Sequence, residues 1–401
     1  LMPSEETKPG DPANTQSPSG DQQATTPLGQ AQTPPSVIET LSTNKLVVLP
    51  FKVLGDGGKG DNFSYGLVSD LTMKLQRVPG LTVISQRSAA AQDSTKPFEE
   101  IGQALKVGSI ISGDVLESDG DVRVNVKLVD ANSGALQWSE SYDGTLEGIL
   151  KLQSQIAQSV AKQLKGVLGV EESASLAKPE TTSAKAYELY LQGRREWNKR
   201  TKESFVAAID LFNQAIALDE NFALAYVGIA DVRLMETFYS ISYPKEAVEK
   251  AREASEKALE INPNLGEAMT NLAMITMSFD YDLIKANELF TKAMSLNPNH
   301  AITYTWGGAC AQILGMHQEG LRRSRNGFEL DPSNAISEHG VCFSLIYSKD
   351  IETAKNNAIE GLKKYPGFHR FVWDLSICHI LEGEPQKAID VFETQKPDLK
   401  G

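Results

Sequence analysis

The sequence predicts two folded parts in succession, an α/β domain with a mixed sheet and an all-α superhelical solenoid. Between residues 46 and 168, short apolar or alternating runs are interleaved with amphipathic stretches, which is the pattern of strands and helices that share one core. Further along, Pro263, Pro298, Pro332 and Pro366 follow one another at intervals of 35, 34 and 34 residues. A constant period of this length indicates stacked helical repeats.

Residues 1–43 predict a flexible tether. They hold seven of the 18 prolines, much Ser, Thr and Gln, and no aromatic residue, so they bury too little apolar surface to offset the entropy of ordering. A tether implies attachment to an upstream domain, a membrane anchor or a cell wall. Because Leu1 is no initiator and no nearby apolar run is long enough for a signal or a membrane span, we expect the carboxyl-terminal part of a longer protein or a processed form.

The α/β domain is expected over residues 44–168. Its expected elements, in order, are a strand at 46–51, a helical face at 63–75, a strand at 81–85, a helix at 98–105, strands at 107–118, 122–130 and 135–144, and a helix at 146–164. Asp119 and Gly120 supply a two-residue hairpin turn between two of these strands. The order βαβαβββα predicts a mixed sheet covered by helices.

The segments LVVLPF (46–51), YGLVSDLTMKL (65–75), IGQALKVGSIISGDV (101–115) and VRVNVKLVDANSGALQWSESYDG (122–144) carry a resemblance. Together they resemble the TolB-like amino-terminal domain that bacterial signalling proteins place beside tetratricopeptide repeats. The resemblance implies a non-enzymatic domain that follows a kinase, a nucleotide cyclase or a winged-helix domain in such proteins. None of these three is present in the 401 residues.

The prolines mark tetratricopeptide repeats over about 186–395, five complete and one partial. Proline cannot continue the second helix of a repeat, and five residues before each proline stands a small residue where helices must approach closely: Ala258, Ala293, Gly327 and Gly361. Residues 169–185 are the expected linker, because the acidic stretch 170–180 has little to bury. The two parts are therefore expected to fold separately.

A partner-binding groove is expected on the first helices of the repeats. The repeat register places on their concave side Met274, Met277, Thr305, Gln312, His339, Phe343, Ile346, Trp373 and Ile377. The positions where related repeats clamp a terminal carboxylate with Lys and Asn hold residues such as Thr270 and Met274, which argues against such a clamp. An apolar groove favours a helix or an extended apolar peptide as the partner.

Composition argues against other classes of function. The net charge is −13, and residues 169–401 carry 25 basic against 33 acidic residues, so nucleic-acid binding by these residues is not expected. All histidines and cysteines follow residue 299. The three cysteines are expected as buried free thiols, and neighbouring Cys and His point about 100° apart on a helix, so no metal site is expected.

The loop GDGGKGD (55–61) lacks a phosphate-binding pattern, because the first Gly would fall at Val53 and Gly60 replaces the magnesium-binding hydroxyl residue. Asp56 and Asp61 lack calcium-loop spacing. No nucleophile motif is present either. We therefore expect no enzyme, no cofactor and no catalytic residue.

The sequence predicts a bacterial scaffold or sensor module that binds a protein or peptide. One alternative is the regulatory part of a longer signalling enzyme or transcriptional regulator. Another is an extracytoplasmic structural subunit of a multi-subunit envelope assembly, with membrane contact only through a missing upstream anchor. The tether favours a periplasmic or other extracytoplasmic location over a cytoplasmic one.

Overall fold

The computed structural model describes residues 40–54, 59–118, 121–145, 148–166, 168–238 and 244–395, which belong to one compact unit that begins at Thr40. The side chains of residues 59–62 are not among those described. Most of the tether (1–39), the loop 55–58 and the Asp119–Gly120 turn lie outside the described residues. The predicted tether ends earlier than residue 43, because Leu41 is buried and its backbone bonds the Asn132 side chain in both directions.

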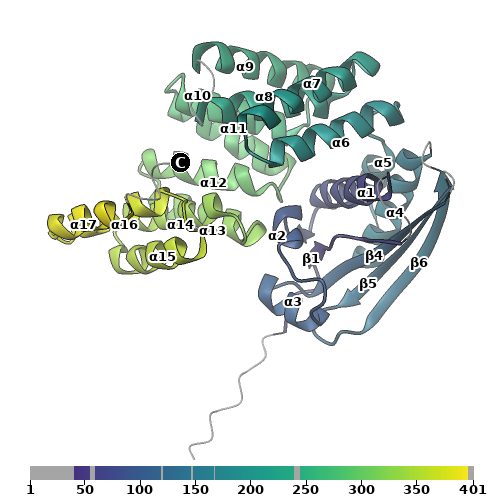
Figure 1. The fold of residues 1–401 in the computed structure, drawn as a ribbon, viewed down its shortest axis with the longest axis horizontal. Coiled ribbons are helices and arrows are strands. Elements are labelled where there is room, and N and C mark those ends of the chain that lie inside the picture. The colour runs from purple at the N-terminus through teal and green to yellow at the C-terminus, as the bar shows by residue number, and fades with distance from the viewer. Residues whose placement is uncertain are drawn as a thin grey trace, which may run out of the picture. The chain divides into compact units, whose positions relative to one another are not determined.

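The amino-terminal part is a mixed sheet with helices, as predicted (Figure 1). Its strands are β1 (Lys45–Val48), β2 (Lys52–Leu54), β3 (Thr82–Val83), β4 (Ser109–Ser118), β5 (Asp121–Asp130) and β6 (Leu136–Thr145). Its helices are α1 (Lys59–Gln76), α2 (Gln86–Ala90), α3 (Phe98–Leu105), α4 (Ile149–Lys165) and α5 (Val170–Ala177). The strand order is β3-β1-β4-β5-β6, and β2 also pairs with β4.

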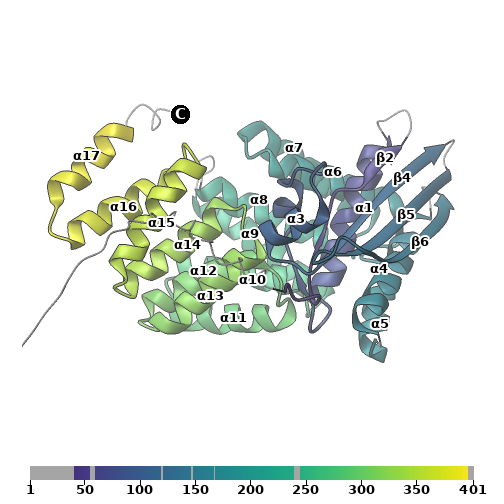
Figure 2. The same ribbon diagram turned by 90° about the horizontal axis from the view of Figure 1, so that it is seen from below.

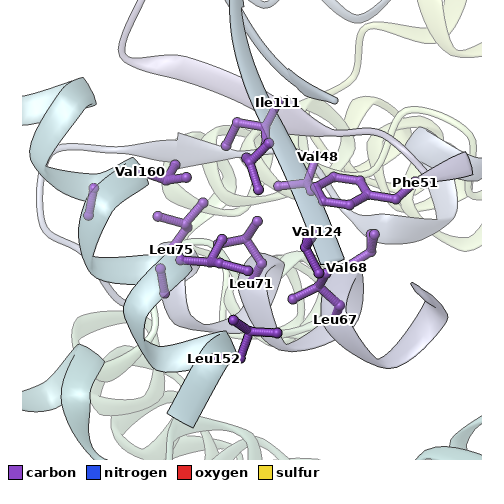
Figure 3. Packing of buried hydrophobic residues seen from close by; sticks show 14 of the residues in the cluster. Val48, Phe51, Leu67, Val68, Leu71, Leu75, Ile111, Val124, Leu152 and Val160 are labelled. Carbon is purple, nitrogen blue, oxygen red and sulfur yellow. The ribbon is translucent and has the colours of Figure 1, made fainter. Parts of the chain in front are cut away.

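The first strand is interrupted at Pro50. Pro50 has no N–H to give to a ladder, so β1 ends before it and β2 begins after it, both parallel to β4. The three strands β4, β5 and β6 form an antiparallel run. One face of this sheet packs on α1 and α4 through the core that Figure 3 shows, in which Leu67, Leu71 and Leu75 of α1 meet Val124 and Val160.

The rest of the unit consists of helix pairs. They are α6 (Ala184–Asn198) with α7 (Lys202–Leu218), α8 (Ala223–Phe238) with α9 (Pro244–Ile261), α10 (Gly266–Ser278) with α11 (Leu283–Leu296), α12 (Ala301–Ile313) with α13 (His317–Leu330), α14 (Ala335–Tyr347) with α15 (Ile351–Lys364), and α16 (Arg370–Leu381) with α17 (Pro385–Gln395). Figure 2 shows them stacked in sequence order. This is the predicted tetratricopeptide solenoid.

Small residues allow the helices of the solenoid to approach closely. A Cβ on Gly361 would lie 2.6 Å from the ring of Phe371, and one on Gly327 would lie 2.7 Å from Thr305 Oγ1. Both positions were singled out in the sequence because they stand five residues before a proline. Larger side chains there would force the stacked helices apart.

The expected linker is not an empty connection. Residues 170–177 form α5, whose Leu176 is buried in the core of the α/β domain. Lys74 of α1 donates to the carbonyl oxygen of Leu176 at 3.3 Å. The expectation that this stretch has little to bury is therefore wrong, because the apolar side chain of Leu176 anchors α5 in the core of the α/β domain. Separate folding of the two parts stays a prediction.

The α/β domain contacts the solenoid along loops between successive helix pairs. The buried side chain of Asn299, between α11 and α12, accepts from Val83 N–H at 3.0 Å. Its amide nitrogen donates to the carbonyl oxygens of Gln76 at 2.8 Å and Leu81 at 2.9 Å. Asn299 thereby provides hydrogen-bond partners for one N–H and two carbonyl groups, at the end of α1 and at β3, that no neighbouring strand pairs with.

The next loop repeats this arrangement with a carboxylate. Asp331, between α13 and α14, accepts from the hydroxyls of Ser85 and Ser88, the latter at 2.7 Å. Ser85 N–H donates to Leu330 O at 2.8 Å, and Ser333 N–H donates to Ser88 Oγ at 3.0 Å. The beginning of α2 is thus held by the solenoid.

Half-buried charges lie at the same junction. Arg77 at the end of α1 forms ion pairs with Glu180 at 2.6 Å and with Glu267 of α10 at 3.5 Å. Burial raises the pKa of Glu267, but the charges of Arg77 and His300 outweigh it and hold this pKa down to about 2. Glu267 therefore carries a full charge at neutral pH.

A second pair, which is buried, lies one turn earlier in α1. Lys74 Nζ lies 3.5 Å from Asp70 Oδ2 and donates to Ser154 Oγ of α4 at 2.8 Å. Burial raises the pKa of Asp70 to about 6, against the opposing charge of Lys74. Lys74 joins α1 to α4 through Ser154, and its hydrogen bonds partly offset the desolvation cost of burying the pair.

Candidate partner-binding surface

Five of the nine predicted groove residues are buried. Met274, Met277, Thr305, Gln312 and Ile346 are each at most 9% exposed. The first helices of neighbouring pairs pack directly on one another, as the 2.7 Å contact of the Thr270 and Thr303 hydroxyls shows. Gln312 likewise donates to the carbonyl oxygen of Ser344 on the next first helix at 3.4 Å. These five side chains hold the stack together and are not accessible to a partner in this structure.

His339 is also a packing residue. Its Nδ1 lies 2.7 Å from Oδ2 of the buried Asp374, so it joins α14 to α16. The imidazole also lies beside the ring of Phe371 in an edge-to-face contact. His339 therefore fixes the spacing of two first helices.

The remaining predicted residues form an exposed apolar surface on α14 and α16. Trp373 is 61% and Ile377 37% exposed, and Phe343 is half-buried. Tyr347 and Ile380 extend the two stripes at helical spacing, with exposures of 41% and 57%. We call Phe343, Tyr347, Trp373, Ile377 and Ile380 the C-terminal strip. Its members Phe343, Trp373 and Ile377 are the predicted groove residues that a partner can reach.

The rings of the strip are held by aromatic neighbours. The centroids of Phe343 and Tyr347 lie 4.6 Å apart. Trp373 meets Phe392 of α17 edge to face at 5.5 Å. Rings fixed in this way lose little entropy when a partner covers them, which suits them as anchors.

Sequence reasoning missed a regular feature beside the strip. Ile313, Tyr347 and Leu381 stand one repeat apart, 34 residues each by subtraction, at or next to the end of a first helix, and all three are substantially exposed. Their common place in the repeat is visible in the sequence. The apolar period alone does not distinguish these exposed helix ends from buried positions.

The cysteines are buried free thiols, as predicted. Burial raises the pKa of Cys310 and of Cys378 to about 11 and raises that of Cys342 further. A thiol with a raised pKa carries almost no thiolate at neutral pH and is a poor nucleophile. Their place in the structure is that of small core residues.

In the part of the chain that the structure describes, one group brings three metal-ligating atoms within 4.8 Å of one another, namely His379, Glu382 and Glu384. His379 Nδ1 lies 3.1 Å from Glu384 and 3.7 Å from Glu382. Lys355 contacts both carboxylate oxygens of Glu382 at 2.6 Å. Because Lys355 already neutralises Glu382, the group is explained as an ion network between α15 and the α16–α17 turn.

The loop residues considered for nucleotide or calcium binding, Asp56, Gly60 and Asp61, lie where side chains are not described. Among the described residues no helix is long and apolar enough to span a bilayer.

No protein-family model matches the chain. It is 23% identical over 216 residues to a putative adenylate cyclase 3 of Rhizobium meliloti, which covers 52% of this chain and 37% of that protein. It is 26% identical over 316 residues to the transcriptional regulator HilA of Salmonella typhimurium, which covers 78% of this chain and 55% of that protein. The chain thus spans about a third to just over a half of the length of these relatives.

Solved structures with similar helical stacks include YrrB, described as a TPR protein with an unusual peptide-binding site (20% identity, TM-score 0.32, covering 47% of this chain and 90% of that one). Another is PilW, a type IV pilus biogenesis factor (13% identity, TM-score 0.41, covering 53% of this chain and 93% of that one).

Proposed function

We propose that the chain is a non-catalytic interaction module that binds a helix or an extended apolar peptide across the C-terminal strip. The supporting observation is the exposure of large apolar side chains at consecutive turns of two neighbouring first helices. An isolated exposed apolar residue needs no explanation, but large apolar side chains exposed at helical spacing on two neighbouring first helices are typical of a protein-binding site.

The test compares isoleucines of similar exposure on different surfaces. Ile380 belongs to the strip, whereas Ile284 of α11 is 69% exposed on a second helix. Trp373→Ala combined with Ile380→Ala is expected to weaken capture of a native partner by about 2 kcal/mol or more, roughly thirtyfold, because truncated anchors dominate binding energy. Ile284→Ala is the matched control and is expected to bind as the unmodified chain does.

A stability measurement separates binding from folding. Phe371 is fully buried, so Phe371→Ala is expected to cost about 3 to 5 kcal/mol of unfolding free energy. Trp373→Ala is expected to leave the melting temperature nearly unchanged. If the strip double variant captures the same proteins with the same affinity as the Ile284→Ala control, partner binding by the strip is refuted.

A second proposal is that the chain is the carboxyl-terminal regulatory part of a longer signalling protein. It is supported by the relatives, a putative cyclase and a transcriptional regulator, of which the chain covers only a part. The TolB-like identity of residues 44–168 belongs to this proposal and is supported by the mixed sheet and its carboxyl-terminal helix. Expression of the native gene from its start, with and without residues 40–395, would test whether this region changes the output of an upstream domain.

A further inference from the structure

The strand β6 leaves one long edge of the sheet free. It stands at the end of the strand order, runs for ten residues, and pairs only with β5 among the described residues. Figure 1 shows it as the outer strand of the sheet, with α4 against its core-side face, where Leu152 lies over Gly144. Most of its residues are exposed, and it contains neither Pro nor Lys, the residues that commonly protect an edge from pairing.

The hydrogen bonds of β5 show which backbone N–H and C=O groups of β6 have no partner on a neighbouring strand. Ala131 N–H donates to Gly108 O on the β4 side, and Asp130 N–H donates to Ala135 O on the β6 side. Because bonding alternates along a strand, the even-numbered residues of β5 bond to β6. Their partners in the regular part of the ladder are Trp138, Glu140, Tyr142 and Gly144. The N–H and C=O groups of Ser139, Ser141 and Asp143 therefore face the free edge.

We propose that a second copy of this chain pairs with this edge, antiparallel, about a two-fold axis at Ser141. In this register Ser141 lies opposite Ser141 of the second copy, and Ser139 lies opposite Asp143 of the second copy. Each such pair exchanges two backbone hydrogen bonds, so the free groups of all three residues are satisfied. Two six-stranded sheets become one continuous sheet.

The side chains select this register. Glu140 lies opposite Tyr142 of the second copy, so that no carboxylate faces another. The single proton of the Tyr142 hydroxyl is donated to Glu140 Oε2 of the same strand at 2.8 Å and in this register can be donated to Glu140 of the second copy instead. Trp138 lies opposite Gly144 of the second copy, over which the side chain of Leu152 of α4 lies, so the indole meets an apolar neighbour there. Moving the axis to Glu140 would set two carboxylates directly opposite each other, which is unfavourable. A shift of the pairing by a single residue would bring core-side and solvent-side residues of the two strands opposite one another.

A second copy fits this edge better than an unrelated strand does, because the strand is complementary to itself. The core-side residues of β6 are, in order, Trp138, Glu140, Tyr142 and Gly144. Antiparallel pairing with a second copy sets Trp138 opposite Gly144 and Glu140 opposite Tyr142, so a large residue meets a small one and an acid meets a hydroxyl. An inward-facing charge such as Glu140 normally discourages edge pairing. Here it discourages the alternative register and has a partner in the proposed one.

The experiment measures the mass of the full chain in solution by sedimentation or light scattering over a range of concentrations. The unmodified chain is expected to form a dimer. Ser141→Pro removes an N–H that faces only the free edge, and Ser141→Lys sets two ammonium groups opposite each other at the axis. Each is expected to raise the dimer Kd by about tenfold or more. Gln103→Lys, on the exposed surface of α3, is the control for added charge.

Cross-linking tests the position of the axis. Thiols introduced by Ser141→Cys would lie within about 6 Å of each other, whereas those from Gln137→Cys on the same strand would lie about 27 Å apart. A short bismaleimide is expected to join the first and not the second, and the unmodified chain with its buried cysteines gives the background. A monomer at every concentration, a dimer unaffected by both Ser141 variants, or equal cross-linking at positions 137 and 141 would overturn the proposal.

Discussion

The asparagine that directly follows the proline in two neighbouring repeats provides a direct test of the junction. The loops INPN (261–264) and LNPN (296–299) have the same chemistry, yet Asn264 is exposed and Asn299 is buried between the solenoid and β3. Asn299→Ala removes one hydrogen bond from Val83 N–H and two to the carbonyls of Gln76 and Leu81. At about 1 kcal/mol for each neutral bond, the loss is roughly 2 to 4 kcal/mol of unfolding free energy.

Urea unfolding of the full chain measures this loss, and hydrogen exchange locates it. In Asn299→Ala the amide of Val83 is expected to exchange faster, because its acceptor is gone. Asn264→Ala removes the same side chain from the same place in a repeat and is expected to change stability by less than about 0.5 kcal/mol. Equal effects of the two substitutions, or an unchanged exchange rate at Val83, would refute the role assigned to Asn299.

Two carboxylates with shifted pKa values predict pH effects of opposite sign. The folded-state pKa of Glu267 is about 2 against an ordinary 4.5, so its charge stabilises the fold above pH 4.5 and this contribution fades toward pH 2. Glu267→Gln should lower the unfolding free energy by about 1.5 to 3 kcal/mol at pH 7, the usual worth of a hydrogen bond to a charged group, and by less below pH 4.5, as urea unfolding would measure. The folded-state pKa of Asp70 is about 6 against 3.8, so the fold binds the extra proton between these values and loses stability as pH rises through 6. Asp70→Asn lacks this dependence, and its stability relative to the unmodified chain should rise between pH 5 and pH 7; parallel pH profiles would contradict this assignment.

The elements of the sheet and the repeats follow from local patterns. Apolar and polar residues alternate from Val122 to Leu128, and Leu67, Leu71 and Leu75 recur at every fourth residue. Each pattern arises because one face of the element is buried, so it is visible in the sequence without knowledge of the fold. The prolines mark the turns for a similarly local reason. These signals were sufficient to predict a mixed sheet followed by a helical solenoid.

The junction and the buried half of the groove depend on contacts that local patterns do not encode. Asn264 and Asn299 are indistinguishable in sequence, and only the approach of a segment more than 200 residues away makes one of them buried. Met274 and Trp373 were both predicted for the groove, but the distance between neighbouring first helices decides which of them a partner can reach. That distance depends on small residues and polar contacts such as His339 with Asp374, not on the apolar period.

The loop contacts of the α/β domain also divide the solenoid mechanically. A stack of repeats bends like a spring, by small rotations between neighbours. Glu267, Asn299 and Asp331 tie three successive loops or helix starts to the α/β domain, at the residue after α1, at β3 and at the start of α2 respectively. These contacts restrict the rotations between α10 and the start of α14. The helices beyond it have no such brace among the described contacts. Bending is therefore expected mainly in the turn of the superhelix that carries the C-terminal strip. A force applied there is transmitted to the α/β domain through the contact of Asp331 with the start of α2.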